Sequence, residues 1–205
     1  MKSMSRSIIV SLILIASPLA CAQDEASVGA LDADTPTTTL RGNRFIAPAN
    51  WSLSVRGPAT FIEAPEGGSQ IVLVDVEAED GDAALAAGWA AYKDIDLPLK
   101  VTNDQPDADG WSRQRQYQYQ TSPNERRSVS AGVMYSGEQW TVWIYDMADE
   151  IGGKRGAQVS LIFGSLYPKG YSPESFAGLT AHDLDAKRIA ALSGFVKAGQ
   201  QASGV

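Results

Sequence analysis

The chain has 205 residues with 24 acidic and 17 basic side chains, a net charge of −7, one histidine and one cysteine. This acidic balance argues against nucleic-acid binding, which depends on Lys and Arg neutralising phosphates. A single histidine excludes metal sites built from histidine clusters, and the length allows a sizeable hydrophobic core.

Residues 1–22 have the three parts of a secretory signal peptide. Lys2 and Arg6 make a positive start, residues 8–16 are apolar, and Ala20-Cys21-Ala22 fits the small-x-small cleavage site. The apolar segment is shorter than the roughly 20 residues that a membrane-spanning helix needs. The sequence therefore predicts release into the periplasm or secretion, with no membrane span in the mature chain.

We expect the mature protein to begin at Gln23, because Ala20 and Ala22 suit the signal peptidase. Lipidation of Cys21 is the alternative, and Pro18 disfavours it because a lipobox carries Leu or a similar residue there. Mass spectrometry of the exported protein decides between the two, since a diacylated Cys21 would contradict cleavage after Ala22. In either case a single cysteine leaves the mature chain without a disulfide.

Residues 23–42 are polar and acidic without an apolar period, so the sequence predicts a disordered linker there. The folded domain is expected over residues 43–168. Within it, residues 51–55 and 61–62 read as strands. Residues 70–77 form an apolar run of the kind that occupies the centre of a sheet.

Residues 80–93 change to a helical period, and Asp80 suits the N-cap of that helix. The apolar stripe of this helix consists of Leu85, Trp89 and Tyr92. Residues 95–106 are predicted to be irregular, with a short strand over residues 99–102.

An antiparallel meander of three strands is predicted over residues 111–121, 127–135 and 139–145, which alternate and are separated by turn residues. In the first strand, alternation places five side chains on one face: Trp111, Arg113, Arg115, Tyr117 and Tyr119. In the third strand, Trp143 and Tyr145 lie on one face. The opposite face of that strand carries Trp140, Val142 and Ile144.

A second helix is predicted over residues 148–166, where apolar residues recur at helical spacing. Residues 169–182 carry the turn residues of a linker, and Asp183 is a natural N-cap for a third helix over residues 183–205. We expect this last helix to be loosely attached, because a single amphipathic helix is marginal in water without a packing partner. The predicted fold class is α+β, an antiparallel sheet flanked by helices.

No catalytic, cofactor-binding or metal-binding constellation can be recognised in the sequence. His182 lies in the predicted linker, and no Gly-x-Ser-x-Gly elbow occurs elsewhere. The acidic run over residues 75–82 fails the calcium-loop template, because Asp80 stands where the loop needs glycine. The chain is therefore expected not to be an enzyme and to need no cofactor.

Six residues are candidates for an interaction surface: Asn124, Glu125, Arg126, Arg127, Trp143 and Tyr145. The first four form a charged hairpin tip that either grips a carboxylate or phosphate or only guards a turn. The two aromatic residues lie opposite an apolar face, so they meet solvent, a second layer of the domain or a partner.

The chain resembles two known groups of proteins. The order of its elements, with Ala-Pro-Glu-Gly before the apolar strand and Gly-Ser-Leu-Tyr-Pro after the second helix, resembles the PsbP-like α+β fold. Three motifs, at residues 121–127, 154–159 and 175–178, resemble the amino-terminal domain of exported bacterial serine hydrolases related to β-lactamases and penicillin-binding proteins. This resemblance covers residues 43–205.

The resemblance implies a non-catalytic accessory or interaction module, whose partner is the catalytic domain of the parent hydrolase or another periplasmic protein. Residues 184–201 would be the first helix of that catalytic domain, so the chain looks like a fragment. The hydrolases work through Ser-x-x-Lys and Tyr-x-Asn, and neither motif occurs, since Ser193 and Lys197 are one residue too far apart. The alternative is a freestanding periplasmic PsbP-like binding domain.

Overall fold

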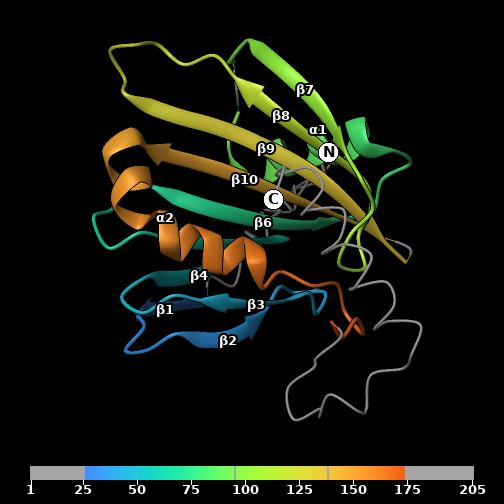
Figure 1. Ribbon diagram of the computed structural model, residues 1–205, viewed down its shortest axis with the longest axis horizontal. Helices are drawn as coiled ribbons and strands as arrows, with labels where there is room; N and C mark the ends of the chain where they lie inside the picture. Colours follow the sequence, from blue (N-terminus) through green and yellow to red (C-terminus); the bar gives the residue numbers. More distant parts are fainter. Residues whose placement is uncertain (1–25, 95, 138, 174–205) are drawn as a thin grey trace, which may run out of the picture. The chain divides into compact units, whose positions relative to one another are not determined.

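The computed structural model describes residues 26–94, 96–137 and 139–173 (Figure 1). The strands of these residues are β1 (Ala26–Ala30), β2 (Thr35–Thr38), β3 (Arg44–Ala47), β4 (Ser52–Arg56), β5 (Ala59–Glu63), β6 (Gln70–Val76), β7 (Leu99–Gln105), β8 (Ser112–Tyr119), β9 (Arg127–Ser136) and β10 (Gln139–Ala148). The helices are α1 (Gly81–Tyr92) and α2 (Asp149–Gly164).

Eight of the strands form one antiparallel sheet in the order β1-β4-β5-β6-β10-β9-β8-β7, and β2 pairs with β3 in a separate hairpin. β6 and β10 meet at the centre of the large sheet, where Val74 lies opposite Val142. The strands β8, β9 and β10 follow one another as the predicted meander. The apolar run over residues 70–77 is the central strand β6, as its two apolar faces indicated.

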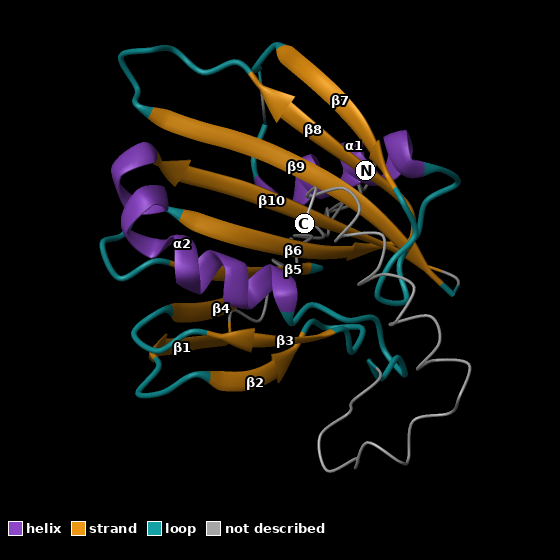
Figure 2. Cartoon of the chain, viewed as in Figure 1, coloured by secondary structure: helices purple, strands orange, loops and turns teal. Residues whose placement is uncertain are grey.

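One face of the large sheet is covered by α1, and the first hydrophobic core lies between them (Figure 2). Asp80 caps α1, because its carboxylate accepts a hydrogen bond from the backbone N–H of Ala83 at 2.8 Å. Gly88 lies directly over β10, since a Cβ added there would be 2.6 Å from Val142. The first core includes Val72, Val74, Trp89, Val133, Trp140 and Ile144.

The opposite face of the sheet is covered by α2 and by β3 of the small hairpin, and the second core lies beneath them. In Figure 1, α2 lies in front of the sheet and runs between β6 and β4 in this view, while α1 lies behind the sheet. The second core includes Phe45, Trp51, Leu73, Trp111, Met147 and Ile162. The predicted fold class, α+β with an antiparallel sheet flanked by helices, is confirmed.

The strands β1 and β2 correct the prediction of a disordered linker over residues 23–42. β1 pairs with β4 at the edge of the large sheet, and Leu31 then exchanges backbone hydrogen bonds with Trp51 and Asn50, at 3.0 and 2.7 Å. An edge strand gains its stability from backbone pairing with one neighbour, so it needs no apolar period that a sequence pattern could reveal. The folded domain therefore begins before residue 43.

A bulge in β8 corrects the predicted face of Trp111. Between Ser112 and Arg115, β8 advances by three residues while β9 advances by two. Arg113 absorbs the extra residue in the left-handed region, with a φ of 48°. The side chains before the bulge therefore change face, so Trp111 lies in the second core while Tyr117 lies in the first.

The predicted signal peptide and the third helix over residues 183–205 lie outside the described residues, and both stay predictions. Residues 99–105 form a strand that is longer than the predicted one. Within the described part of the chain, neither helix has the length and apolar character that crossing a membrane requires.

Candidate functional site

Two hollows of the described surface are candidates for a binding site. The polar cleft is lined by residues that include Leu40, Arg41, Asn43, Glu77, Gln139 and Lys169. The aromatic groove is lined by Trp111, Trp143, Tyr145 and Phe163 together with Gln114, Gln116 and Ser130.

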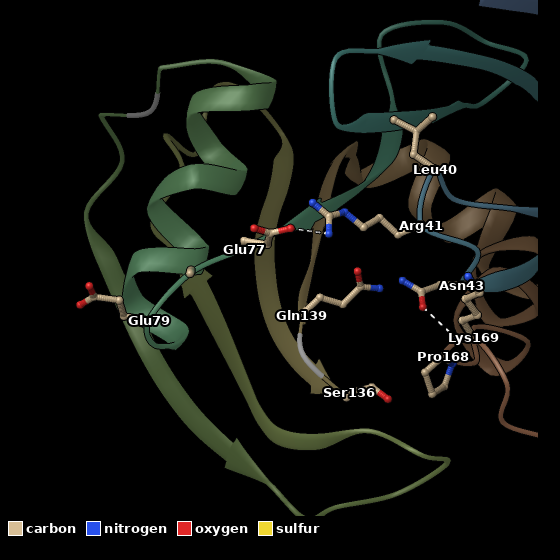
Figure 3. A pocket seen from close by; sticks show the side chains of 11 residues that line it. Leu40, Arg41, Asn43, Glu77, Glu79, Ser136, Gln139, Pro168 and Lys169 are labelled. Carbon is tan, nitrogen blue, oxygen red and sulfur yellow. Dashed lines mark hydrogen bonds and ion pairs between the residues drawn. The ribbon is translucent and has the colours of Figure 1, made fainter.

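The polar cleft has a volume of about 1120 Å³ and opens at the end of the sheet, where β6, β9 and β10 meet the turn between β2 and β3 (Figure 3). Arg41 reaches across it to Glu77 in an ion pair of 2.7 Å, whereas Glu79 points away from the other side chains. The Glu77 side chain is 72% exposed, so water screens this pair. The cleft is wide, and the charges of Arg41 and Glu77 are already paired with each other.

A buried hydrogen-bond network holds the wall of the polar cleft. The Asp75 carboxylate accepts from the backbone N–H of Arg41 at 3.0 Å, from Asn43 Nδ2 at 2.8 Å and from the Thr141 hydroxyl at 3.0 Å. Asn43 Nδ2 also donates to Thr141 Oγ1 at 2.9 Å, and Asn43 Oδ1 accepts from the Lys169 backbone N–H at 3.1 Å. These shared partners fix the turn before β3 against the sheet.

The aromatic groove has a volume of about 440 Å³ and is lined by residues of α2, β8, β9 and β10. The rings of Trp143 and Phe163 meet edge to face, with centroids 5.2 Å apart and planes at 70°. Trp143 and Tyr145 are only half-buried. Burial and then the charge of Asp149 raise the pKa of Tyr145, so the phenol stays a neutral hydrogen-bonding group at physiological pH.

Two glycines give the groove its aromatic surface. Gly132 on β9 lies opposite Trp143 on β10, and a Cβ added to Gly132 would be 2.3 Å from the indole ring. A Cβ added to Gly152 on α2 would be 2.5 Å from the Tyr145 hydroxyl oxygen. Any other residue at these positions would displace the ring beside it. A lone glycine inside a strand pattern indicates such close approach, and this signal could have drawn attention to Gly132.

A tight turn places Trp111 at the groove. Asp109 and Gly110 have φ values of 55° and 81°, which are typical of the two-residue Asp-Gly hairpin turn. Ala108 and Trp111 close the turn with backbone hydrogen bonds of 3.0 and 2.8 Å. The Trp111 indole N–H then donates to the backbone carbonyl of Leu166 at 3.0 Å, which ties this wall to the segment after α2.

A row of amide side chains leads from the groove to the edge of the sheet. Gln116 lies opposite Gly132, which lies opposite Trp143, so Gln116 and Trp143 share one face. We call this row the amide strip, and it comprises Gln105, Asn103, Gln114, Gln116 and Gln118. The strip ends on β7, an edge strand whose side chains are all exposed. Sequence analysis did not single out these amides.

Arg127, a predicted interaction residue, has a structural partner in Asp146. The Asp146 side chain is fully buried and accepts hydrogen bonds from Arg127 Nε, from Lys93 Nζ at 2.5 Å and from the Tyr92 hydroxyl at 2.7 Å. Burial alone would raise the pKa of Asp146, but these hydrogen bonds outweigh it and lower the pKa. Arg127 also donates to the backbone carbonyl of Gly68 at 3.0 Å.

The structure divides the six predicted interaction residues. Asn124, Glu125 and Arg126 are exposed in the connection between β8 and β9. Arg127 contacts Asp146 on the face of the first core, whereas Trp143 and Tyr145 line the aromatic groove on the opposite face. The six residues therefore do not form one surface. A second layer, α2, packs against the two aromatic residues and still leaves them partly accessible to solvent.

The acidic run over residues 75–82 has separate structural roles. Asp75 belongs to the buried network, Asp80 caps α1, and Asp82 accepts a hydrogen bond from the Tyr117 hydroxyl at 3.1 Å. Among the described residues, His, Cys, Asp and Glu side chains do not gather in a group that could hold a metal ion.

Comparison with known proteins identifies no family for this chain. No family model matches it, and no curated protein matches it. Among solved structures, it is similar to the solution structure of cyanobacterial PsbP (CyanoP) from Synechocystis sp. PCC 6803. The identity is 13% and the TM-score 0.48, over 75% of this chain and 99% of that one. At these values the similarity says nothing about activity or partners, and the resemblance to serine hydrolases stays a prediction.

Proposed function

We propose that this chain is an export-targeted, non-catalytic binding domain and that the aromatic groove is its binding surface. The observation that carries the proposal is the half-buried pair Trp143 and Tyr145, held beside glycines in a defined groove. Aromatic side chains are enriched where proteins bind partners and ligands. The groove also has the size of a small-molecule site, which is typically about 300–1,000 Å³.

The groove is better suited to binding than the polar cleft. Two complete cores lie on the two faces of the sheet, so the exposed part of the Trp143 and Tyr145 rings adds little to folding. Trp143 is fixed by Phe163, so little side-chain freedom remains to be lost on binding. In the polar cleft, by contrast, a ligand would compete with the Arg41–Glu77 pair and with water.

A fragment screen followed by amide chemical shifts tests the binding surface. We expect ligands to perturb the amides of residues 130–134 and 143–145, and Trp143→Ala to abolish these shifts. Arg126→Ala, at the exposed loop tip, is the matched control and should change nothing. Shifts that cluster at Arg41, Asn43 and Gln139, or no shifts at all, would overturn the proposal.

We expect this chain alone not to hydrolyse β-lactams or simple esters. Covalent catalysis needs an activated nucleophile beside a base, and the sequence lacks both Ser-x-x-Lys and Tyr-x-Asn. The mature protein should therefore remain unlabelled by a fluorescent penicillin and by a fluorophosphonate probe, with a known serine hydrolase as positive control. Labelling of any serine would contradict the non-catalytic part of the proposal.

A finer form of the proposal makes the domain the accessory module of an exported serine hydrolase. The motifs at residues 121–127 and 154–159 support it, and they fall in the β8–β9 connection and in α2. Reading the DNA after the codon for Val205 tests this form. An open frame that continues into Ser-x-x-Lys supports the accessory module, and a stop codon with no such gene nearby supports a freestanding binding domain.

A further inference from the structure

We infer that the aromatic groove binds a neutral oligosaccharide whose chain extends along the amide strip, an inference that rests on the proposed function. A sugar ring has an apolar C–H face and a rim of hydroxyl groups. It is therefore recognised by aromatic surface that lies beside side chains able both to donate and to accept hydrogen bonds.

The aromatic surface is in place before a ligand arrives. Trp143 is held beside Gly132 and against Phe163, and Trp111 is tied to the Leu166 carbonyl. An ordered ring presents apolar area to a sugar face at little entropic cost. Trp143 and Tyr145 are half-buried, so part of this area remains accessible to a ligand.

The amide strip supplies the polar half of the site. Each Gln or Asn side chain offers an N–H donor and a carbonyl acceptor, which match two neighbouring hydroxyl groups. Gln114, Gln116 and Gln118 alternate along β8 at about 6.6–6.8 Å, and Asn103 lies across from Gln116 on the next strand. Because this row runs from the groove to the edge of the sheet, it fits a chain of sugar units better than a single one.

The charge, the polar side chains and the strand pairing of the groove each exclude one class of competing ligand. No Lys or Arg is among its described lining residues, and Asp109 is the carboxylate there, so an anionic ligand finds no counter-charge. A purely apolar ligand would leave the Gln116 and Ser130 side chains desolvated, and nothing on such a ligand could hydrogen-bond them. An extended peptide binds a free strand edge, whereas β8 and β9 beneath the groove are paired on both sides.

The test is a titration of the mature protein with short neutral oligosaccharides built from glucose, N-acetylglucosamine or mannose, followed by amide chemical shifts and calorimetry. We expect shifts along residues 114–118, 130–134 and 143–145, with an affinity that does not change between low and high salt. Gln116→Leu should weaken binding by up to about tenfold, because a lost hydrogen bond is worth about 1.4 kcal/mol at most. Trp143→Phe, which keeps an aromatic ring at this position, should weaken it as well.

Gln139→Leu makes the same chemical change in the polar cleft and is the matched control, so its affinity should equal that of the unmodified protein. An equal loss in Gln139→Leu and Gln116→Leu would overturn the inference. Binding of charged or apolar fragments to the groove without any oligosaccharide binding would overturn the sugar assignment alone. If neither oligosaccharides nor fragments shift the amides of the groove, both this inference and the proposed function fail.

Discussion

Replacing Asp146 with Ala should lower the free energy of unfolding by about 3–5 kcal/mol, the usual cost of removing one partner from a buried ion pair. The Asp146 carboxylate is fully buried, and it joins Lys93 and Tyr92 at the end of α1 to Arg127 at the start of β9. Without it, Lys93 and Arg127, which are only partly exposed, lose the counter-charge that they share. Urea unfolding measures the loss as a lower midpoint with an unchanged slope.

The pH dependence separates this effect from simple loss of packing. Because the folded-state pKa of Asp146 is lowered, its stabilisation is present above the ordinary Asp pKa of about 3.9 and is lost as the pH falls through the folded value. The difference in the free energy of unfolding between the unmodified protein and Asp146→Asn should therefore be large at pH 7 and small in acid. Asp104→Asn, which breaks the exposed pair with Arg115, is the control and should leave the midpoint nearly unchanged. If this difference stayed constant with pH, the result would contradict the ionic role of the Asp146 carboxylate.

Replacing Asn43 with Asp should destabilise the fold by about 3–5 kcal/mol at pH 7, because it puts a second carboxylate against buried Asp75. Two carboxylates at this distance cannot both ionise, so the pKa of one of them rises strongly. A raised folded-state pKa means that the folded protein binds a proton more tightly, so the stability of this variant should recover as the pH falls. Asn43→Ala removes the hydrogen bonds without adding charge.

Thermal and urea unfolding at several pH values measure both Asn43 variants. We expect Asn43→Ala to lose about 2 kcal/mol with little pH dependence, whereas Asn43→Asp should be the less stable of the two at pH 7 and the more stable in acid. If the two variants change in parallel with pH, the buried network is not organised around the Asp75 carboxylate.

The parts of the fold that could be predicted are those that local pattern determines. The helix over residues 80–93 was marked by its period and by Asp80, and the central strand by apolar residues on both faces. The meander was visible because side chains alternate and turns interrupt them. The strands β1 and β2 escaped prediction because backbone pairing, which leaves no pattern in the side chains, holds them.

The candidate site was predictable only in part, for a related reason. Trp143 and Tyr145 stood out because they lie opposite an apolar face. Their groove also depends on Trp111. Strict alternation puts Trp111 on the same face as Tyr117, but the bulge at Arg113 turns it to the opposite face. The Asp146 cluster joins residues far apart in the chain, so Arg127 looked like a free charge until its partner was known.

The bulge in β8 is a single extra residue, so the insertion or deletion of one codon decides whether Trp111 forms a wall of the aromatic groove. A relative that lacked the extra residue at Arg113 would keep every strand pairing, yet its counterpart of Trp111 would turn to the side of Tyr117. Such a relative would retain the architecture and lose one wall of the groove. Sequence alignments that close this one-residue gap would group relatives with and without this wall of the groove, whereas the gap itself should separate them.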